Sequence, residues 1–166
     1  DDIGATRATL GLTYGDVRHV LLTHYHNDHI GSTTEVLEQA AGAVAHAGEL
    51  DLDEIGGGTI DVDDIRPLRG GEEVFGLEVL HTPGHTEGHI AVIDHEAGLL
   101  VAGDALTADD NGVAGPNPRF TADLDTAHDS VRRLAELSFN TLLVGHGDPI
   151  ETGADADVAA LAATLA

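Results

Sequence analysis

Residues 23–31 read Thr-His-Tyr-His-Asn-Asp-His-Ile-Gly, a stretch that crowds three histidines and one aspartate into six positions. Imidazole and carboxylate groups are the ligands that zinc and related cations take in proteins. A single surface histidine is usually only a solvated side chain, but four potential ligands on one loop are unfavourable neighbours unless a cation lies between them. We therefore predict that this loop binds metal. Its candidate ligands are His24, His26, Asp28 and His29.

The segments on either side of this loop predict a strand before it and a helix after it. Residues 20–23 are apolar and β-prone. Ser32 is a helix-capping residue type, Glu35 stands three positions later, and apolar residues follow at helical spacing. We expect a helix over 32–41 whose N-terminus points free N–H groups toward the ligand loop.

Three further candidate ligands each follow an apolar run that ends in a glycine-containing turn. His85 lies in the segment 80–89, Asp104 follows 99–103, and His146 follows 142–145. Glycine allows the tight turn and the close approach that an ion site needs. Four strand ends of this kind could place all seven ligands around one point.

With these motifs the chain resembles the metallo-β-lactamase-fold hydrolases. The family motif His-x-His-x-Asp-His is filled by residues 24–29, and its Thr-Pro-Gly-His-Thr segment by 82–86. Its Gly-Asp and late Gly-His pairs are matched by 103–104 and 145–146. The resemblance extends over the chain from Val17 onward.

The resemblance implies two divalent metal ions, with zinc favoured and iron or manganese as alternatives. It implies that the first ion is held by His24, His26 and His85. It implies that the second ion is held by Asp28, His29 and His146, and that both are bridged by Asp104.

The implied fold is α+β, a four-layer αβ/βα metallo-β-lactamase sandwich formed by a single domain over 1–166. Family members have several strands before the first ligand loop, whereas 23 residues precede His24 here. We therefore expect the first N-terminal strands to be lacking, which leaves one sheet exposed. Three interpretations are open: the sequence is truncated, the family pattern is locally shortened, or a second copy of the chain, in a homo-oligomer, covers that sheet.

Helical and β-prone segments alternate along the chain, as an α+β fold requires. Helices are expected over 5–12, 32–41, 49–55, 123–137 and 156–165. Strands are expected over 20–23, 43–47, 65–68, 77–82, 90–94, 99–102 and 141–144. Between Asp104 and the helix at 123 we expect a long irregular stretch.

This irregular stretch leaves directly from Asp104, so we expect it to wall a substrate pocket. Arg119 is a candidate to bind a substrate carboxylate, and Phe120 to form an apolar wall; the simpler interpretations are a surface ion pair and a core position. Tyr25 lies between two ligands and either projects into the pocket or packs beneath it. His89 is expected to support the ligands rather than to bind metal.

The ligand set indicates hydrolysis by a bridging hydroxide, with Asp28 as a ligand that also handles the proton of the water. The chain contains no cysteine, which excludes thiol catalysis. The aspartate at position 104 resembles the glyoxalase II-like thioesterase and lactonase branches. We therefore predict a dinuclear hydrolase of a small thioester, lactone or related ester. The alternatives are a truncated or oligomer-dependent metal-binding module with little turnover alone and, less favoured, a zinc β-lactamase or a nuclease.

The charge balance is extreme, with 30 acidic residues against seven arginines, no lysine and a net charge of −23. Such a chain repels phosphates, so a nucleic-acid partner is not expected.

The composition resembles that of a salt-adapted protein, because a dense carboxylate surface is screened in concentrated salt and repels itself in dilute buffer. Apolar runs fall short of the ~18 residues of a membrane helix, no secretory signal is visible, and the absence of cysteine fits a cytoplasmic location.

Overall fold

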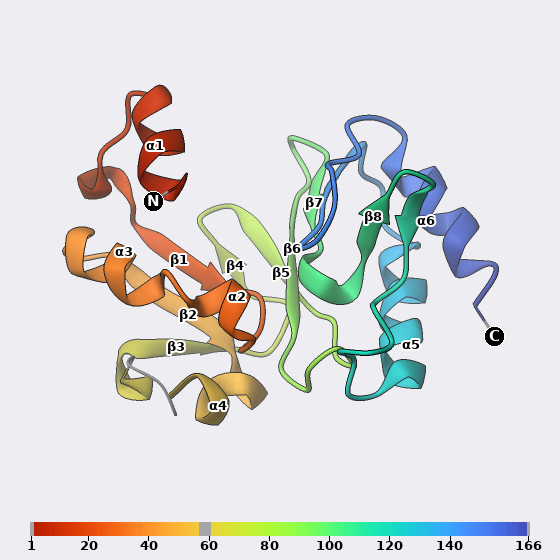
Figure 1. Ribbon diagram of the computed structural model, residues 1–166, viewed down its shortest axis with the longest axis horizontal. Helices are drawn as coiled ribbons and strands as arrows, with labels where there is room; N and C mark the ends of the chain where they lie inside the picture. Colours follow the sequence, from red (N-terminus) through yellow and green to blue (C-terminus); the bar gives the residue numbers. More distant parts are fainter. Residues whose placement is uncertain (1, 57–60, 166) are drawn as a thin grey trace.

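The computed structural model of the chain describes residues 2–56 and 61–165. Its strands form two main sheets and a separate small hairpin (Figure 1). The first sheet is parallel throughout and has the strand order β1-β2-β3. Its members are β1 (His19–Leu22), β2 (Val44–Gly48) and β3 (Ile65–Leu68).

The second sheet is mixed and has the strand order β10-β7-β6-β5-β4. Only β10 and β7 run parallel among these described strands, and the other neighbours are antiparallel. The strands are β4 (Glu73–Val74), β5 (Leu77–His81), β6 (Ile90–Asp94), β7 (Leu99–Val101) and β10 (Thr141–Leu143). The small hairpin consists of β8 (Thr107–Asp109) and β9 (Gly112–Ala114).

Helices cover the outer faces of both main sheets, and the inner faces pack against each other (Figure 1). The helices are α1 (Asp2–Thr9), α2 (Asn27–Ile30), α3 (Thr33–Gln39), α4 (Leu52–Gly56), α5 (Leu124–Leu134) and α6 (Ala154–Ala162). Apolar residues of α2, α3 and α4 pack on the first sheet. Residues of α5 and α6 pack on the second, so the order of layers is helix, sheet, sheet, helix.

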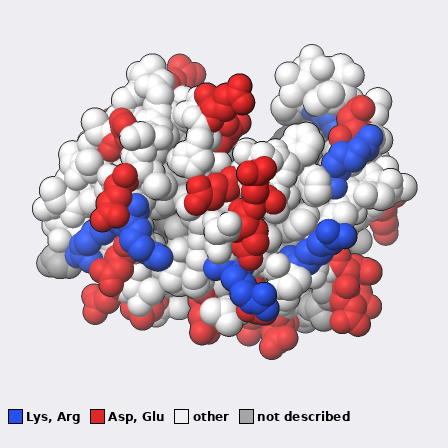
Figure 2. Space-filling view, turned by 180° about the vertical axis from the view of Figure 1, so that it is seen from behind, with Lys and Arg blue, Asp and Glu red and all other residues white. Residues whose placement is uncertain are grey.

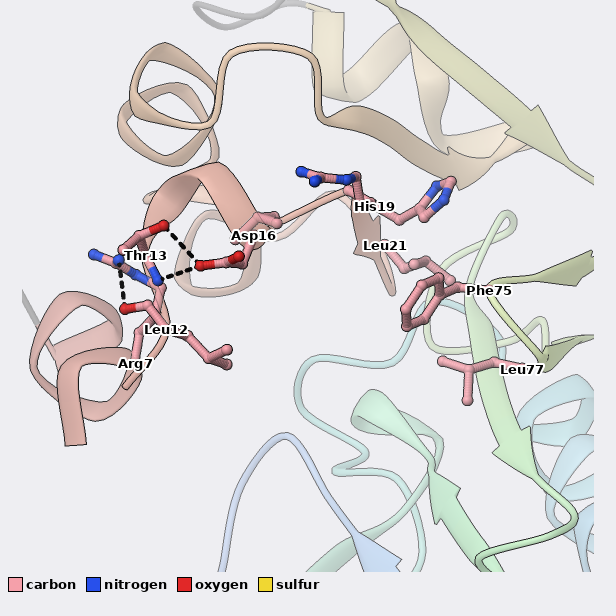
Figure 3. A pocket seen from close by; sticks show the side chains of 10 residues that line it. Arg7, Leu12, Thr13, Asp16, His19, Leu21, Phe75 and Leu77 are labelled. Carbon is pink, nitrogen blue, oxygen red and sulfur yellow. Dashed lines mark hydrogen bonds between the residues drawn. The ribbon is translucent and has the colours of Figure 1, made fainter. Parts of the chain in front are cut away.

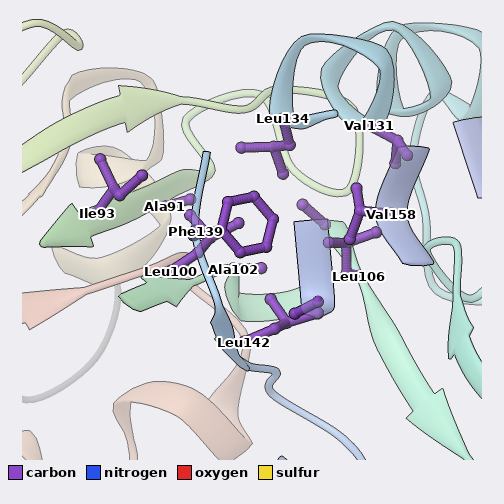
Figure 4. Packing of buried hydrophobic residues seen from close by; sticks show 12 residues of the cluster. Ala91, Ile93, Leu100, Ala102, Leu106, Val131, Leu134, Phe139, Leu142 and Val158 are labelled. Carbon is purple, nitrogen blue, oxygen red and sulfur yellow. The ribbon is translucent and has the colours of Figure 1, made fainter. Parts of the chain in front are cut away.

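The largest hydrophobic cluster lies between the second sheet and its two helices (Figure 4). Leu100 and Leu142 extend from adjacent strands toward Val131 and Leu134 of α5. The Asp123 side chain caps α5, because its Oδ1 accepts a hydrogen bond from the Thr126 N–H at 3.1 Å. Such a cap contributes about 1 kcal/mol to helix stability. The strands that carry the site are therefore backed by a rigid layer.

Two local predictions are confirmed only in part. The helix expected over 32–41 begins at Thr33, and the Ser32 side chain forms no capping hydrogen bond. Its backbone is already helical, with φ −95° and ψ −1°, because α2 leads almost directly into α3 and leaves no extended residue between them. The stretch after Asp104 is also not irregular throughout, since it contains the β8–β9 hairpin.

A groove of about 470 Å³ opens between the N-terminal segment and the two sheets (Figure 3). It is lined by apolar side chains that include Leu12, Leu21 and Leu77, and by Phe75, which is 78% exposed. Among the described strands, β1 pairs with β2 alone, so its other edge is free. The expectation of an uncovered sheet edge agrees with this arrangement, and the homo-oligomer stays a prediction.

On the face shown in Figure 2, acidic side chains are spread out rather than gathered in one block, and arginine side chains lie among them. Arg69 forms an ion pair with Glu49. Arg132 forms another with Asp129, with 2.6 Å between Arg132 Nη1 and Asp129 Oδ1. Exposed pairs of this kind contribute little to stability. Within residues 2–56 and 61–165, no helix has the length and apolar character needed to cross a membrane.

Candidate metal centre

The seven predicted ligands come together from segments that follow the C-terminal ends of β1, β5, β7 and β10. They form two groups, within each of which the ligand atoms lie no more than 4.8 Å apart. The first group contains His24, His26, His85 and Asp104. The second group contains Asp28, His29 and His146. The seven residues were predicted from separate sequence motifs, and the structure brings them together in one site.

The first group is largely buried and brings three imidazole nitrogens almost to one point. His26 Nδ1 lies 2.9 Å from His24 Nε2 and 3.0 Å from His85 Nε2. His24 and His85 are buried, and His26 is partly exposed. Lone pairs that converge this closely repel one another unless a proton or a cation lies between them. Three imidazoles and a carboxylate are a ligand set that zinc and iron accept.

The second group lies at the surface. The carboxylate of Asp28 is 3.2 Å from His146 Nε2 and 3.7 Å from His29 Nε2. The side chains of Asp28 and His146 are 60% and 55% exposed, whereas that of His29 is 13% exposed. Both Asp28 and His29 lie on the single-turn helix α2 rather than on a loop. The second group is therefore open to solvent, and to any substrate, on one side.

Asp104 lies between the two groups and reaches both. Its Oδ2 is 3.3 Å from His85 Nε2 and 3.4 Å from His146 Nε2, and its Oδ1 is 3.2 Å from His29 Nε2. Among the described residues, Oδ1 is a buried oxygen without a hydrogen-bond partner in acceptable geometry. A buried carboxylate oxygen without such a partner is costly. The donor set around Asp104 therefore fits a pair of cations bridged by this carboxylate.

Two glycines let the chain approach Asp104. A Cβ atom on Gly145 would lie 2.0 Å from Asp104 Oδ1 and 2.7 Å from His29 Cε1. Gly103 has a φ of +53°, and a Cβ there would lie 2.7 Å from His89 Nε2. Any larger residue at either position displaces a ligand or its support, which explains why a glycine directly precedes both Asp104 and His146.

Hydrogen bonds that His85 and His89 donate to neighbouring threonines accompany one defined ring tautomer of each histidine. Thr121 Oγ1 donates its hydrogen to the Asn117 carbonyl at 2.8 Å, so it must accept from His85 Nδ1–H at 3.3 Å. His89 Nε2 accepts from the Asp104 N–H at 3.1 Å, so its Nδ1–H donates to Thr82 Oγ1 at 2.7 Å. His85 Nε2 is left free for a metal. His89 holds the Asp104 backbone, as expected of a supporting residue.

Burial keeps the imidazoles of His24 and His85 neutral. Burial and the neighbouring His89 lower the pKa of His24 to about 2, and burial lowers the pKa of His85 to about 4. Burial alone raises the pKa of Asp104, but favourable interactions with His29, His24 and His85 lower it to about 2. At neutral pH the neutral imidazoles of His24 and His85 therefore lie beside an ionised Asp104 carboxylate. Metal binding requires that protonation state.

A cavity of about 630 Å³ opens onto both ligand groups. Phe120 lines it, as predicted for an apolar wall, but Tyr25 and Arg119 do not. Tyr25 packs with the hydrophobic cluster beneath the first sheet, and the Arg119 guanidinium lies 5.5 Å from the centre of the Phe120 ring. The other lining residues are His26, Asn27, Asp28, Asp104, Thr107, Asn117 and His146. Sequence reasoning missed the three uncharged polar ones among them, because amides and hydroxyls in loops carry no distinctive pattern.

The sequence profile of the metallo-beta-lactamase superfamily matches residues 4–146. The chain belongs to the metallo-β-lactamase superfamily. Its topology also agrees with solved members of that superfamily. TTHA1623, solved in a di-iron-bound form, superposes with a TM-score of 0.75 at 29% identity, covering 95% of this chain and 82% of that one. FIM-1 from Pseudomonas aeruginosa, a metallo-β-lactamase solved in a mono-zinc form, superposes with a TM-score of 0.74 at 20% identity. The superposition covers 98% of this chain and 72% of that one.

Among characterised relatives within the superfamily, the hydroxyacylglutathione hydrolase of Aeromonas hydrophila is 37% identical over 125 residues. That alignment covers 75% of this chain and 45% of the relative. The chain thus spans about half the length of the relative that it matches.

Proposed function

We propose that this protein is a dinuclear metal-dependent hydrolase that acts on a small thioester, with a lactone or related ester as the next candidates. The observation that carries the proposal is the position of Asp104, whose carboxylate faces both ligand groups. When bound, two divalent cations would polarise the substrate carbonyl and lower the pKa of a water molecule beside it. Zinc is favoured, and iron and manganese are alternatives.

The residues of the chain have separable roles in this proposal. His24, His26 and His85 would hold the first cation, and the exposed group the second. The Asp28 side chain is 60% exposed and its Oδ2 lies 3.2 Å from His146 Nε2, so this carboxylate would bind the second cation and accept the proton of the attacking water. Phe120 would exclude water from one side of the substrate.

Support for a thioester comes from the named activity of the Aeromonas hydrophila relative and from the carboxylate at position 104. The chain covers less than half of that relative, so the substrate of this protein is our inference and not an inherited property. Among the residues that line the described cavity there is no arginine, which does not favour a polyanionic substrate such as a nucleic acid.

A second candidate function is a metal-binding module with little turnover alone. The exposure of Asp28 and His146 favours it, because solvent-exposed ligands bind their cation less tightly than buried ones. The free edge of β1 favours a module that works only within an assembly.

Turnover by metal-loaded and metal-stripped protein separates these two functions. We propose a panel of neutral and anionic thioesters and lactones, measured in multimolar KCl. Hydrolysis of at least one substrate that is lost on stripping and restored by zinc supports the hydrolase. An Asp28→Asn variant should keep the first cation, bind the second less tightly and lose most of the rate. Protein that binds metal but hydrolyses none of the substrates would favour the metal-binding module.

A further inference from the structure

Asp51 is a buried carboxylate that the proposed mechanism does not use. It ends the single 3₁₀ turn η2 (Glu49–Asp51), which follows β2, and it is only 1% exposed. Burial raises the pKa of Asp51, so placing this group in the interior carries a cost. A buried charge of this kind is retained only where its hydrogen bonds offset that cost.

The hydrogen-bond partners of Asp51 all lie on ligand loops. Its Oδ2 accepts from Thr86 Oγ1 at 2.6 Å, and its Oδ1 accepts from the Gly88 N–H at 2.7 Å. The backbone of Tyr25 also hydrogen-bonds to this carboxylate and opposes the effect of burial on its pKa. Tyr25 stands between His24 and His26 in the sequence, and Thr86 follows His85 directly.

Close packing keeps the second of these loops, which carries His85, against the carboxylate. A Cβ atom on Gly88 would lie 2.4 Å from the Asp51 nitrogen and 2.7 Å from its Oδ1. A Cβ atom on Gly48 would lie 1.7 Å from the Gly88 carbonyl oxygen. Glycine at both positions is what allows the second loop to reach Asp51.

We propose that Asp51 is a positioning residue that holds the two loops of the first ligand group at the separation a metal ion requires. This role rests on the proposed function, because it presumes a cation between His26 and His85. The 3.0 Å separation of their facing nitrogens depends on two loops that come from different sheets. Asp51 connects those loops through one rigid group, and outer partners of this kind tune metal affinity.

The geometry distinguishes this role from simple stabilisation of the fold. A carboxylate offers only acceptors, and all three partners are donors. Asparagine has nearly the same shape, but its NH₂ group replaces one of the two accepting oxygens. In this site that NH₂ group would face another hydrogen-bond donor, such as the Gly88 N–H or the Thr86 hydroxyl. The Asp51→Asn substitution should therefore separate the loops without opening a cavity.

The test compares cobalt binding by the full chain and by matched variants in multimolar KCl. The variants are Asp51→Asn, Thr86→Val, Thr86→Ser and the control Asp53→Asn, which removes an exposed charge two positions away. The measurements are the affinity for Co²⁺ by chelator competition, the visible spectrum of bound Co²⁺, and thermal unfolding without metal. The Thr86 pair keeps the test usable if Asp51→Asn does not fold.

We expect Asp51→Asn to lower the affinity of the first site roughly 10–100-fold and to alter the cobalt spectrum. Thr86→Val should change the affinity and the spectrum in the same direction, but to a smaller extent. Thr86→Ser and Asp53→Asn should match the wild type. Wild-type affinity and spectrum in Asp51→Asn and in Thr86→Val, even with lower thermal stability, would overturn the positioning role. A wild-type chain that binds no cobalt would instead overturn the proposed function, and this role with it.

Discussion

Thr121 Oγ1 lies 3.3 Å from His85 Nδ1, and the hydrogen of that hydroxyl is already donated to the Asn117 carbonyl. The pair therefore connects a metal-facing imidazole to the turn that carries Asn117 and Phe120 into the cavity. The backbone supports the same connection, since the Ala122 N–H donates to the His85 carbonyl at 3.1 Å. A substitution at Thr121 should thus affect metal binding as well as the substrate.

We predict that Thr121→Val lowers metal affinity several-fold, because His85 Nδ1 loses the acceptor that fixes its protonation. Thr121→Ser keeps that acceptor and should retain affinity near the wild-type value. Calorimetric zinc titration of both variants measures the difference. Equal affinities for the valine and serine variants would show that the hydroxyl does not orient His85.

The metal-free fold should lose stability as the pH falls below neutrality. Burial lowers the pKa of His89 to about 3 from its ordinary value of 6.5. Between these values the unfolded chain takes up a proton that the folded chain does not, so acid favours unfolding. His24 and His85 act in the same direction, whereas the pKa of His29 is raised by Asp104 and acts in the opposite direction.

Each buried neutral histidine should contribute a slope of about 1.4 kcal/mol per pH unit in this window. Urea unfolding of metal-free protein at pH values from 6.5 down to about 4, the pKa of His85 in the folded chain, measures the total slope. A His89→Asn variant should be less stable at neutral pH and show a shallower slope. An unchanged slope in that variant would mean that His89 gains its proton in the folded protein.

The acidic surface should make stability depend on salt. Acidic side chains cover much of the face in Figure 2, and exposed ion pairs between them and the arginines are few among the described residues. Screening of this repulsion favours the compact state, so the melting temperature should rise from dilute buffer to multimolar KCl. An uncharged osmolyte at equal osmolality is the control. Equal melting temperatures at low and high KCl would exclude salt adaptation of the fold.

Phe120 should contribute to substrate binding rather than to the chemical step. It lines the cavity although it is 57% exposed. We expect Phe120→Ala to raise KM several-fold with little change in kcat, since an apolar wall binds substrate and transition state alike. Phe75→Ala, which removes an exposed aromatic ring from the separate groove, is the matched control. A fall in kcat with unchanged KM would contradict this assignment.

The ligand positions were predictable because each combines a rare residue type with a recognisable local pattern. Asp104 and His146 both follow an apolar strand and a glycine, and these strands coincide closely with β7 and β10. The strands expected over 65–68 and 90–94 coincide with β3 and β6 for the same reason. Strong local patterns survive folding because tertiary packing reinforces them.

Other features depend on contacts that no local pattern records. Asp51 is one of 30 acidic residues, and only the approach of two distant loops distinguishes it from the exposed ones. Ser32 has the residue type of a cap, but the preceding short helix removes the extended backbone that capping needs. The turn between β8 and β9 consists of Asp110 and Asn111, and turn-forming residues of this kind are also common in irregular loops.

The metal content of the protein and of its Asp104→Ala variant tests the central claim most directly. Both proteins, with Asp110→Ala as an exposed control, are loaded with zinc in multimolar KCl and analysed for bound metal and for turnover of the same thioester. Because Asp104 faces both ligand groups, we predict a dinuclear wild type and a variant that has lost metal and most of its turnover. A variant that keeps the metal content and turnover of the wild type would contradict the account.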